Sequence, residues 1–424
     1  METAPSKTKL PAVFFDGRRG EYWIELESRF LKVSPKDVFR HFIHCDSSFG
    51  WEDWVDGMKQ GDRVFVKAQI ERHVDYAGPL AGHKCGAFLT SSGNRILVTT
   101  QPRLDFGKAK GEFEFIDGFI GRLLGGEQAE YFLAWLKFAR ASLLAGDFRP
   151  GQCLVLAGAG GCGKSFLQVL ITEILGGRVA CPFRYMMGES SFNLDLAMAE
   201  HLAIEDKNAS TDIRSRRSFG ARIKEFTVCA EMSIHGKGCT AITLPTYKRL
   251  TISVNDESEN LLIVPPLDAS LADKITLFKC DSARDWLHED RAKNMSLIRA
   301  ELPAFVAFLA KHTVRKEIRC TRYGVKSYHH PDLLQELTHS EPHTRLLALI
   351  DEFLFDDKSP TPLTGTAAKL ETRLREAVPK DQIDKLLYFS GACGTYLGRL
   401  AHKLPDRVKC NGKVGINYWT IKAP

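Results

Sequence analysis

The 424-residue sequence lacks three features: a CxxC cysteine pair, an apolar run of about 18 residues, and any low-complexity segment or internal repeat. Without CxxC pairs, and with an odd total of 11 cysteines, a zinc knuckle or a disulfide framework is disfavoured and reduced thiols are expected. The missing apolar run excludes a membrane-spanning helix, so no membrane partner is expected. Residues 1–9 are polar and lack the apolar core of a signal peptide, which predicts a cytoplasmic protein.

The bulk composition is that of a globular protein with a modest basic excess. Hydrophobic residues make up 44% of the chain and charged residues 26%. The 58 Lys and Arg residues exceed the 52 Asp and Glu residues, which gives a net charge of +6. This charge permits a polyanionic partner without requiring one. The length allows two or three domains.

Hydrophobic periodicity divides the chain into three predicted domains. Residues 1–117 form short runs of alternating apolar and polar residues, which predict a small β-rich N-terminal domain. These runs are 12–15, 22–26, 64–70 and 95–100. Residues 118–340 alternate strand and helix patterns, which favours an α/β core. Residues 341–424 end in a pattern of three helices and two strands.

The middle region opens with a predicted amphipathic helix over 126–145 that ends near Gly146. An apolar run at 153–157 is suited to a buried parallel strand, and a helix is predicted over 166–175. Three further strand candidates are 202–204, 242–244 and 250–254. From residue 265 to 310 the pattern is mainly helical.

A glycine-rich turn joins the first of these strands to its helix. The sequence GAGGCGKS matches the phosphate-loop pattern GxxxxGK[ST] in full. Its residues are Gly158, Ala159, Gly160, Gly161, Cys162, Gly163, Lys164 and Ser165. The glycines let backbone N–H groups curve around the β-phosphate of ATP, Lys164 reaches the β and γ oxygens, and Ser165 holds Mg²⁺. The following helix directs its positive N-terminal end at the phosphates. ATP and Mg²⁺ are therefore the predicted cofactors.

Two later strand patterns end in polar residues suited to the same site. The run at 201–204 is followed by Glu205 and Asp206. We assign Asp206 mainly to Mg²⁺ and Glu205 mainly to the attacking water, although the two roles could be exchanged. Asn255 follows the strand pattern 250–254, where its amide can bond both the γ-phosphate and the water. The alternatives are a solvated acidic turn for the carboxylates and an ordinary turn for Asn255.

The phosphate loop, the paired acids and the strand-terminal Asn together resemble superfamily 3 helicases, the hexameric AAA+ motors of viruses, phages and plasmids. Residues 118–340 are more closely similar to the helicase part of phage and mobile-element primase-helicase proteins. The supporting stretches are 136–156, 192–196, 216–224, 254–261 and 265–275. The resemblance implies an α/β fold with an AAA+ P-loop NTPase core, in a bacterial or phage-infected cell.

The resemblance also implies two further functional elements. A basic motif between the acids and the Asn would form a hairpin that grips DNA in the central pore, and His235 and Lys237 occupy that position. A plain surface turn is the alternative. The family also supplies an arginine finger to the neighbouring subunit's ATP. Lys274 stands at the matching position and offers a point charge without a planar fork. The alternative fingers are Arg249, Arg284 and Arg217.

The three helices and two strands of residues 341–424 form the outline of a winged helix. The predicted helices are 344–355, 367–377 and 386–404, and the predicted strands are 408–411 and 415–421. Basic residues outnumber acids from residue 396 onward, so we expect the last helix and the wing to contact DNA. The candidate DNA-binding residues are Arg399, Lys403, Lys409 and Lys413. A protein-docking winged helix is the alternative.

These features predict an ATP-dependent DNA helicase that translocates on single-stranded DNA as a hexameric ring in phage or mobile-element replication. Its expected partners are single-stranded and forked DNA, further copies of itself, and a separate primase or polymerase. The alternative is a DNA-binding initiator or effector ATPase that remodels DNA or a partner without processive unwinding. A small-molecule phosphotransferase is disfavoured because the sequence offers no acceptor pocket or lid.

Overall fold

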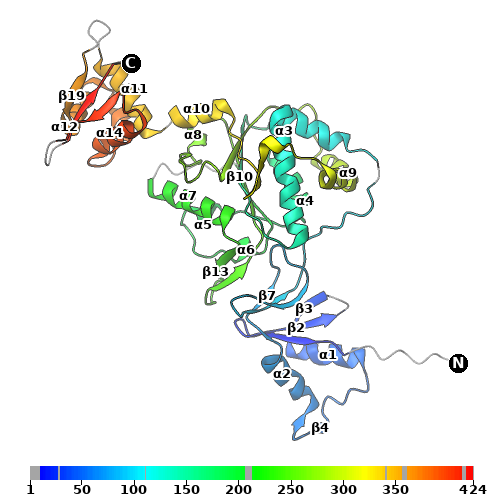
Figure 1. The fold of residues 1–424 in the computed structure, drawn as a ribbon. Helices are drawn as coiled ribbons and strands as arrows, with labels where there is room; N and C mark the ends of the chain where they lie inside the picture. Colours follow the sequence, from blue (N-terminus) through cyan, green and yellow to red (C-terminus); the bar gives the residue numbers. More distant parts are fainter. Residues whose placement is uncertain are drawn as a thin grey trace. The chain divides into compact units, whose positions relative to one another are not determined.

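The computed structural model describes residues 10–26, 29–109, 111–205, 213–339, 341–355, 361–412 and 417–423 (Figure 1). The chain divides into two compact units. The first comprises Met1–Asp256 with Ile263–His329, and the second comprises Glu257–Leu262 with His330–Pro424. Within the described part of the chain, no helix combines the length and the apolar character needed to cross a bilayer.

A five-stranded parallel sheet forms the centre of the first unit. In spatial order its strands are β11 (Val179–Ala180), β12 (His201–Glu205), β15 (Arg249–Val254), β10 (Cys153–Gly158) and β16 (Ile275–Cys280). Every residue of β10 and β15 is buried, as expected for strands covered on both faces. The mixed α/β class predicted from the sequence is therefore present.

Three helices share one hydrophobic core with β10 and β16: α3 (Glu114–Ala145), α4 (Lys164–Ile174) and α9 (Arg291–Lys311). Figure 1 shows α3 and α4 beside the sheet, with α9 packed next to these two helices. Helix α3 is two helical segments joined at Gly125, whose φ of 66° and ψ of 175° are not helical. The second segment corresponds to the predicted helix 126–145, and the helix ends at Gly146 in the left-handed conformation.

One prediction for this region was wrong. The stretch after residue 265, predicted to be mainly helical, contains β16 in the core sheet, because its residues Ile-Thr-Leu-Phe-Lys-Cys lack the strict alternation of a half-buried strand. The strand predicted at 242–244 is present as β14 (Ile242–Pro245), but it pairs antiparallel with β13 (Glu231–Ile234) in a separate hairpin and not in the core sheet. The remaining short helices of this region are α5 (Phe183–Met186) and α6 (Leu194–Ala197), and the longer α7 (Ile213–Val228) contacts β15.

The N-terminal region of this unit contains two small sheets and two helices. One sheet has the order β3 (Arg29–Val33), β2 (Glu21–Leu26), β1 (Val13–Asp16), β6 (His73–Val74). The other has the order β7 (Tyr76–Gly78), β9 (Arg95–Val98), β8 (Gly86–Leu89). Helices α1 (Pro35–Cys45) and α2 (Gln60–Ile70) flank the hairpin β4 (Trp54–Val55)–β5 (Met58–Lys59). The strand predicted at 64–70 was wrong, because these residues form α2 and bury Ala68 on one helical face.

A buried ion pair ties the N-terminal region to the core sheet. The Glu200 side chain is fully buried and accepts hydrogen bonds from the guanidinium of Arg178 and from the N–H of Gly82, the latter at 2.8 Å. Arg178 also donates to the carbonyl of Leu80 at 3.2 Å. Glu200 directly precedes β12, so both charges lie at the border between the two parts of the unit.

The second unit packs helices around a three-stranded antiparallel sheet with the order β19 (Leu363–Thr366), β21 (Tyr418–Ile421), β20 (Val408–Cys410). Its helices are α8 (Ser258–Leu261), α10 (Pro331–His339), α11 (Pro342–Leu354), α12 (Ala367–Ala377), α13 (Lys380–Leu386) and α14 (Ala392–Lys403). The helix predicted over 386–404 begins later, at Ala392, because Gly391 adopts a left-handed conformation. The sequence pattern also missed β19, whose residues Leu-Thr-Gly-Thr are weakly apolar.

Candidate active site

The predicted phosphate loop and its polar partners lie at one edge of the core sheet. Ala157 of β10 is opposite Val254 of β15, and Glu205 of β12 is opposite Ser253 of β15. Because all three strands are parallel, their carboxyl ends coincide. The loop after β10, the carboxylate at the end of β12 and Asn255 after β15 therefore lie at the same edge.

Lys164 makes the direct contact between the loop and Asn255. Its ammonium nitrogen lies 3.3 Å from Asn255 Oδ1, 2.7 Å from the carbonyl oxygen of Gly158 and 2.9 Å from that of Ala159. Lys164 is only 4% exposed, whereas Asn255 is half-buried. A lysine with its charge held among oxygens at the mouth of a loop is suited to an anionic ligand.

Close packing explains the glycines of the loop. A Cβ atom at Gly158 would lie 2.4 Å from the carbonyl oxygen of Cys280, so only glycine fits there. Gly161 and Gly163 have φ values of +75° and +123°, which L-residues rarely adopt. At Gly163 a Cβ would also lie 3.1 Å from the ring of Phe119 in α3. The first segment of α3 thus packs directly beneath the loop.

The residues at this edge fit a nucleoside triphosphate with Mg²⁺. Gly160 and Gly161 are exposed, and a Cβ at either would meet nothing within 4 Å, so the loop backbone is open to a ligand. The first N–H groups of α4, which directly follows the loop, have no acceptor within the helix and are available to an anion, as at helix N-termini generally. Ser165 is partly accessible and Glu205 is exposed, whereas Asp206 lies outside the described residues.

The described ranges hold no group of three or more His, Cys, Asp or Glu side chains that could bind a metal by themselves. Mg²⁺ at a nucleotide site is bound mainly by phosphate oxygens and water, with one or two protein ligands. Ser165 and a carboxylate at the end of β12 satisfy that need without a larger cluster.

A buried polar network between α4 and the core sheet was not predicted. His201 is fully buried, its Nδ1 lies 2.7 Å from Thr172 Oγ1, and its Nε2 lies 2.8 Å from Thr251 Oγ1. Gln168 donates to Thr251 Oγ1 at 2.8 Å and to the carbonyl oxygen of Ile204 at 3.2 Å. The network joins α4 to β12 and β15, the two strands that lead to Glu205 and Asn255. A histidine within an apolar strand run was the only signal in the sequence.

Protonation of this network gives a pH-dependent prediction. Burial lowers the pKa of His201 to about 3. Between pH 6.5 and about 3 the unfolded chain binds a proton at this side chain that the folded chain does not. We therefore expect His201 to contribute a loss of unfolding free energy of at most about 1.4 kcal/mol for each pH unit below 6.5. Urea unfolding at several pH values measures this slope.

The variant His201→Gln should show a shallower decline of unfolding free energy with falling pH than the wild type. The exposed His44 on α1 provides the control, because His44→Gln removes an imidazole without touching the network. Equal slopes for wild type and His201→Gln would contradict the prediction.

The basic motif predicted for the pore lies in the connection between β13 and β14. Asn193 is buried, donates to the carbonyl oxygen of Ser233 at 2.9 Å and accepts from the N–H of His235 at 2.7 Å. These bonds hold the end of β13, while Lys237 is exposed in the turn. The structure thus places His235 and Lys237 in the turn of a hairpin that is separate from the core sheet.

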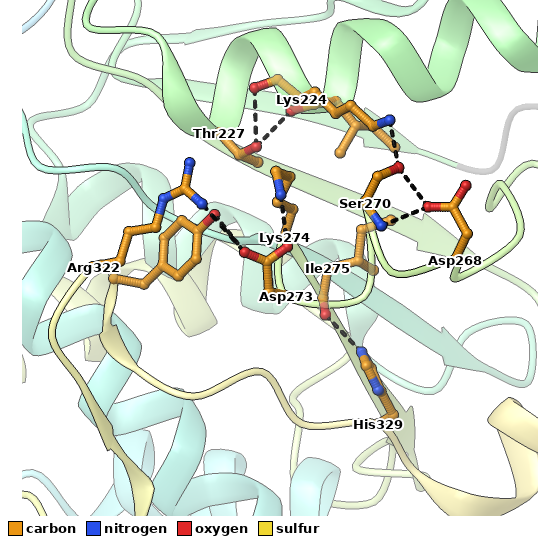
Figure 2. Close-up of polar contacts among 11 residues, drawn as sticks. Lys224, Thr227, Asp268, Ser270, Asp273, Lys274, Ile275, Arg322 and His329 are labelled. Carbon is orange, nitrogen blue, oxygen red and sulfur yellow. Dashed lines mark hydrogen bonds and ion pairs between the residues drawn. The ribbon is translucent and has the colours of Figure 1, made fainter.

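Lys274 lies at the edge of the sheet opposite the phosphate loop. Its carbonyl oxygen accepts from the N–H of Cys153, the first residue of β10, at 2.8 Å. Its ammonium is 2.6 Å from Asp273, which also receives Tyr323 Oη at 3.2 Å and Arg322 at 3.4 Å (Figure 2). Burial alone would raise the pKa of Asp273, but these partners lower it overall. Lys274 therefore cannot serve the phosphate loop of its own subunit.

The alternative fingers differ in accessibility. Arg249 is buried, and its guanidinium donates to the carbonyl oxygens of Lys248 at 2.7 Å and Arg149 at 3.1 Å. This arginine is thus committed to the interior and unsuited to reach a neighbouring subunit. Arg284 is exposed after β16, and the side chain of Arg217 lies outside the described part of the structure.

Neither a protein family nor a curated protein matches the sequence. Solved structures do match. Two structures of the C-terminal region of NrS-1 (305–718) align over 98% of this chain and 97% of theirs, with 13% identity and TM-scores of 0.59 and 0.58. A third NrS-1 C-terminal structure matches with 12% identity, the same coverage and a TM-score of 0.59. The chain has the fold of the NrS-1 C-terminal region.

The predicted DNA-binding residues of the second unit differ from one another in whether an acidic side chain of this chain pairs with them. Lys403 lies 2.6 Å from Glu341, and Arg407 forms an ion pair with Asp351 at 2.5 Å. The sequence argument counted charges only from residue 396 onward and so missed these two acids. Of the other candidates, Arg399 on α14 and Lys409 on β20 are exposed, and Lys413 lies outside the described residues.

Proposed function

We propose that the chain is an ATP-dependent DNA helicase that translocates on single-stranded DNA as a hexameric ring in phage or mobile-element replication. The observation that carries this proposal is the 3.3 Å contact between Lys164 Nζ and Asn255 Oδ1 at the sheet edge where Glu205 also ends. The NrS-1 fold supports it by showing that the whole chain, flanking regions included, follows one known architecture.

In this proposal each residue of the site has a distinct role. The loop backbone and Lys164 would bind the β- and γ-phosphates, and Ser165 and Asp206 would hold Mg²⁺, which would supply positive charge to the transferred phosphoryl group. Glu205 would accept a proton from the attacking water. Asn255 donates to the γ-phosphate and orients that water, so its contact with Lys164 places both groups at one reacting centre.

The ring supplies what a single chain lacks. Lys274 is at the far edge of the sheet from the phosphate loop of the same chain, so it can act only on the nucleotide of a neighbour. Its ammonium would leave Asp273 to reach the γ-phosphate, and Arg284 is the accessible alternative. His235 and Lys237 would contact the DNA backbone in the pore, and the second unit would act as a winged helix that positions the motor.

A strand-displacement assay tests the proposal. Wild type should unwind a forked duplex with ATP, and Lys237→Ala should unwind at least about tenfold more slowly, equal to ~1.4 kcal/mol of lost transition-state stabilisation. Lys293→Ala, an equally exposed lysine near the start of α9, is the matched control and should unwind as wild type does. If Lys237→Ala unwinds at the wild-type rate, or wild type hydrolyses ATP without unwinding, the initiator or effector ATPase becomes the better reading.

A further inference from the structure

A strongly basic groove lies in the first unit, away from the candidate active site. Its volume is about 810 Å³, and its walls come from the second segment of α3, the end of α9, and the hairpin β17 (Arg319–Cys320)–β18 (Gly324–Val325). The basic residues that line it are Lys137, Arg149, Lys311, His312, Arg319 and Lys326. No Asp or Glu is among the residues that line it.

The cations of this groove have no carboxylate partner in the part of the chain that the structure describes. Within the described ranges, none of its Lys or Arg side chains has a carboxylate within 4.0 Å. The hairpin's other arginine, Arg322, is paired with Asp273, and nearby Arg315 is paired with Glu130. Two described acidic side chains close to the groove, Glu130 and Asp273, thus pair with Arg315 and Arg322, which do not line it.

Hydrogen bonds to backbone oxygens hold two of these cations in place. Lys137 Nζ donates to the carbonyl oxygens of Ala310 at 3.0 Å and His312 at 2.5 Å, at the C-terminal end of α9. Arg319 Nε donates to the carbonyl oxygen of Val314 at 2.8 Å. Lys137 and Arg319 are therefore positioned before any ligand binds. Burial lowers the pKa of His312, and the charge of Lys137 lowers it further against the opposing effect of Glu130, so the positive charge of the groove comes from its Lys and Arg side chains.

The size and chemistry of the groove favour a chain of phosphates over one small anion. The volume matches sites for large ligands, and the five permanent charges come from separate elements and line an open surface. Its one phenyl ring, Phe138, packs against Gly324, where a Cβ would lie 2.4 Å from the ring, and the Arg149 guanidinium lies 5.9 Å from the ring centroid. The groove thus offers mainly cations, which suit a phosphate backbone better than a platform for stacked bases.

We propose that this groove binds the phosphodiester backbone of nucleic acid, as a contact separate from the hairpin that carries Lys237. Arg149 precedes β10 by only a few residues, so the groove lies at the edge of the sheet opposite the phosphate loop. The six residues of β10 span roughly 20 Å between the two edges. Nucleic acid bound in the groove would be held by contacts to its phosphates, so the affinity would not depend on base sequence.

The test is the salt dependence of nucleic-acid binding, measured by fluorescence anisotropy in the absence of ATP. The two probes are a labelled 30-nucleotide oligo-dT and a labelled 30-base-pair duplex. The double variant Lys311→Ala/Lys326→Ala removes two exposed cations, neither of which forms an ion pair within the described ranges. We expect weaker binding of at least one probe and a slope of log K against log salt that is shallower by about 1 to 2, since each lost phosphate contact removes about 0.7 to 0.9.

The control Lys36→Ala/Lys293→Ala removes the same charge from exposed lysines outside the groove. Thermal unfolding of each variant verifies the fold, and Lys311→Glu/Lys326→Glu should weaken binding further. The strand and duplex arms show which form of nucleic acid the groove prefers. Slopes equal to those of the control for both nucleic-acid probes would overturn the proposal. Labelled poly-glutamate serves as a third probe: if the groove variant loses affinity for poly-glutamate alone, the groove is an acidic-peptide site and the proposal is also overturned. Because no ATP is present, this outcome is independent of whether the chain hydrolyses ATP.

Discussion

The variant Lys164→Ala is expected to hydrolyse ATP about 10²–10³-fold more slowly than the wild type, the range seen when one preorganised donor to a developing charge is removed. Lys164 is the only described side chain that contacts both the phosphate loop and Asn255, so its loss removes the charge at the centre of the site. Steady-state phosphate release measures the effect.

Two comparisons make this result specific. Lys293→Ala on α9 removes an exposed lysine of the same unit and should hydrolyse ATP at the wild-type rate. Because the buried Lys164 also bonds two loop carbonyl oxygens, thermal unfolding must show that the variant folds. Asn255→Ala provides a second test of the same centre, because Asn255 is less buried. Retention of hydrolysis within about threefold by both folded variants would refute the assigned site.

The variant Glu200→Ala is expected to lose about 3–5 kcal/mol of unfolding free energy, the usual result of leaving one partner of a buried ion pair alone. Glu200 is fully buried and Arg178 is only 19% exposed at the side chain. The alanine leaves the Arg178 guanidinium and the Gly82 N–H without their acceptor. Urea unfolding gives the change as a shift in midpoint at constant slope.

An exposed ion pair supplies the contrast. Glu52 lies 2.6 Å from Lys59, but its side chain is 73% exposed, so Glu52→Ala should cost no more than about 1 kcal/mol. The double variant Arg178→Met/Glu200→Leu, which removes both charges, should recover much of the stability lost by Glu200→Ala. If Glu200→Ala and Glu52→Ala lower the unfolding free energy by the same amount, the buried ion pair stabilises the fold no more than an exposed one does.

The sequence predicted the local structure around the candidate site where that structure depends on neighbouring residues in the chain. The spacing of Gly158, Gly163 and Lys164 is local, so the motif specifies a strand, a turn and a helix in sequence order. The placement of Asn255 followed from a strand pattern with one polar end. In a parallel sheet, strands that end in polar residues bring them to one edge, which made the meeting of Lys164 and Asn255 predictable.

The predictions failed where tertiary context decides. The apolar run of β16 has no alternation because both of its faces are buried, so its pattern does not distinguish a strand from a helix. Helix α2 packs one face against a cluster that contains several aromatic side chains. Over the seven residues 64–70, the apolar residues of that face give a pattern that resembles a strand. The pairing of Lys403 with Glu341 joins residues 62 positions apart, and no local count of charges reveals it.

The break at Gly125 separates two parts of α3 that have different neighbours. The first segment places Phe119 next to Gly163 of the phosphate loop, and the second carries Lys137 into the groove at the opposite edge of the core sheet. An unbroken helix would transmit any tilt from one end to the other as a stiff rod. Because the helical geometry is interrupted at Gly125, a small tilt of the first segment beside the phosphate loop need not be transmitted to the second segment.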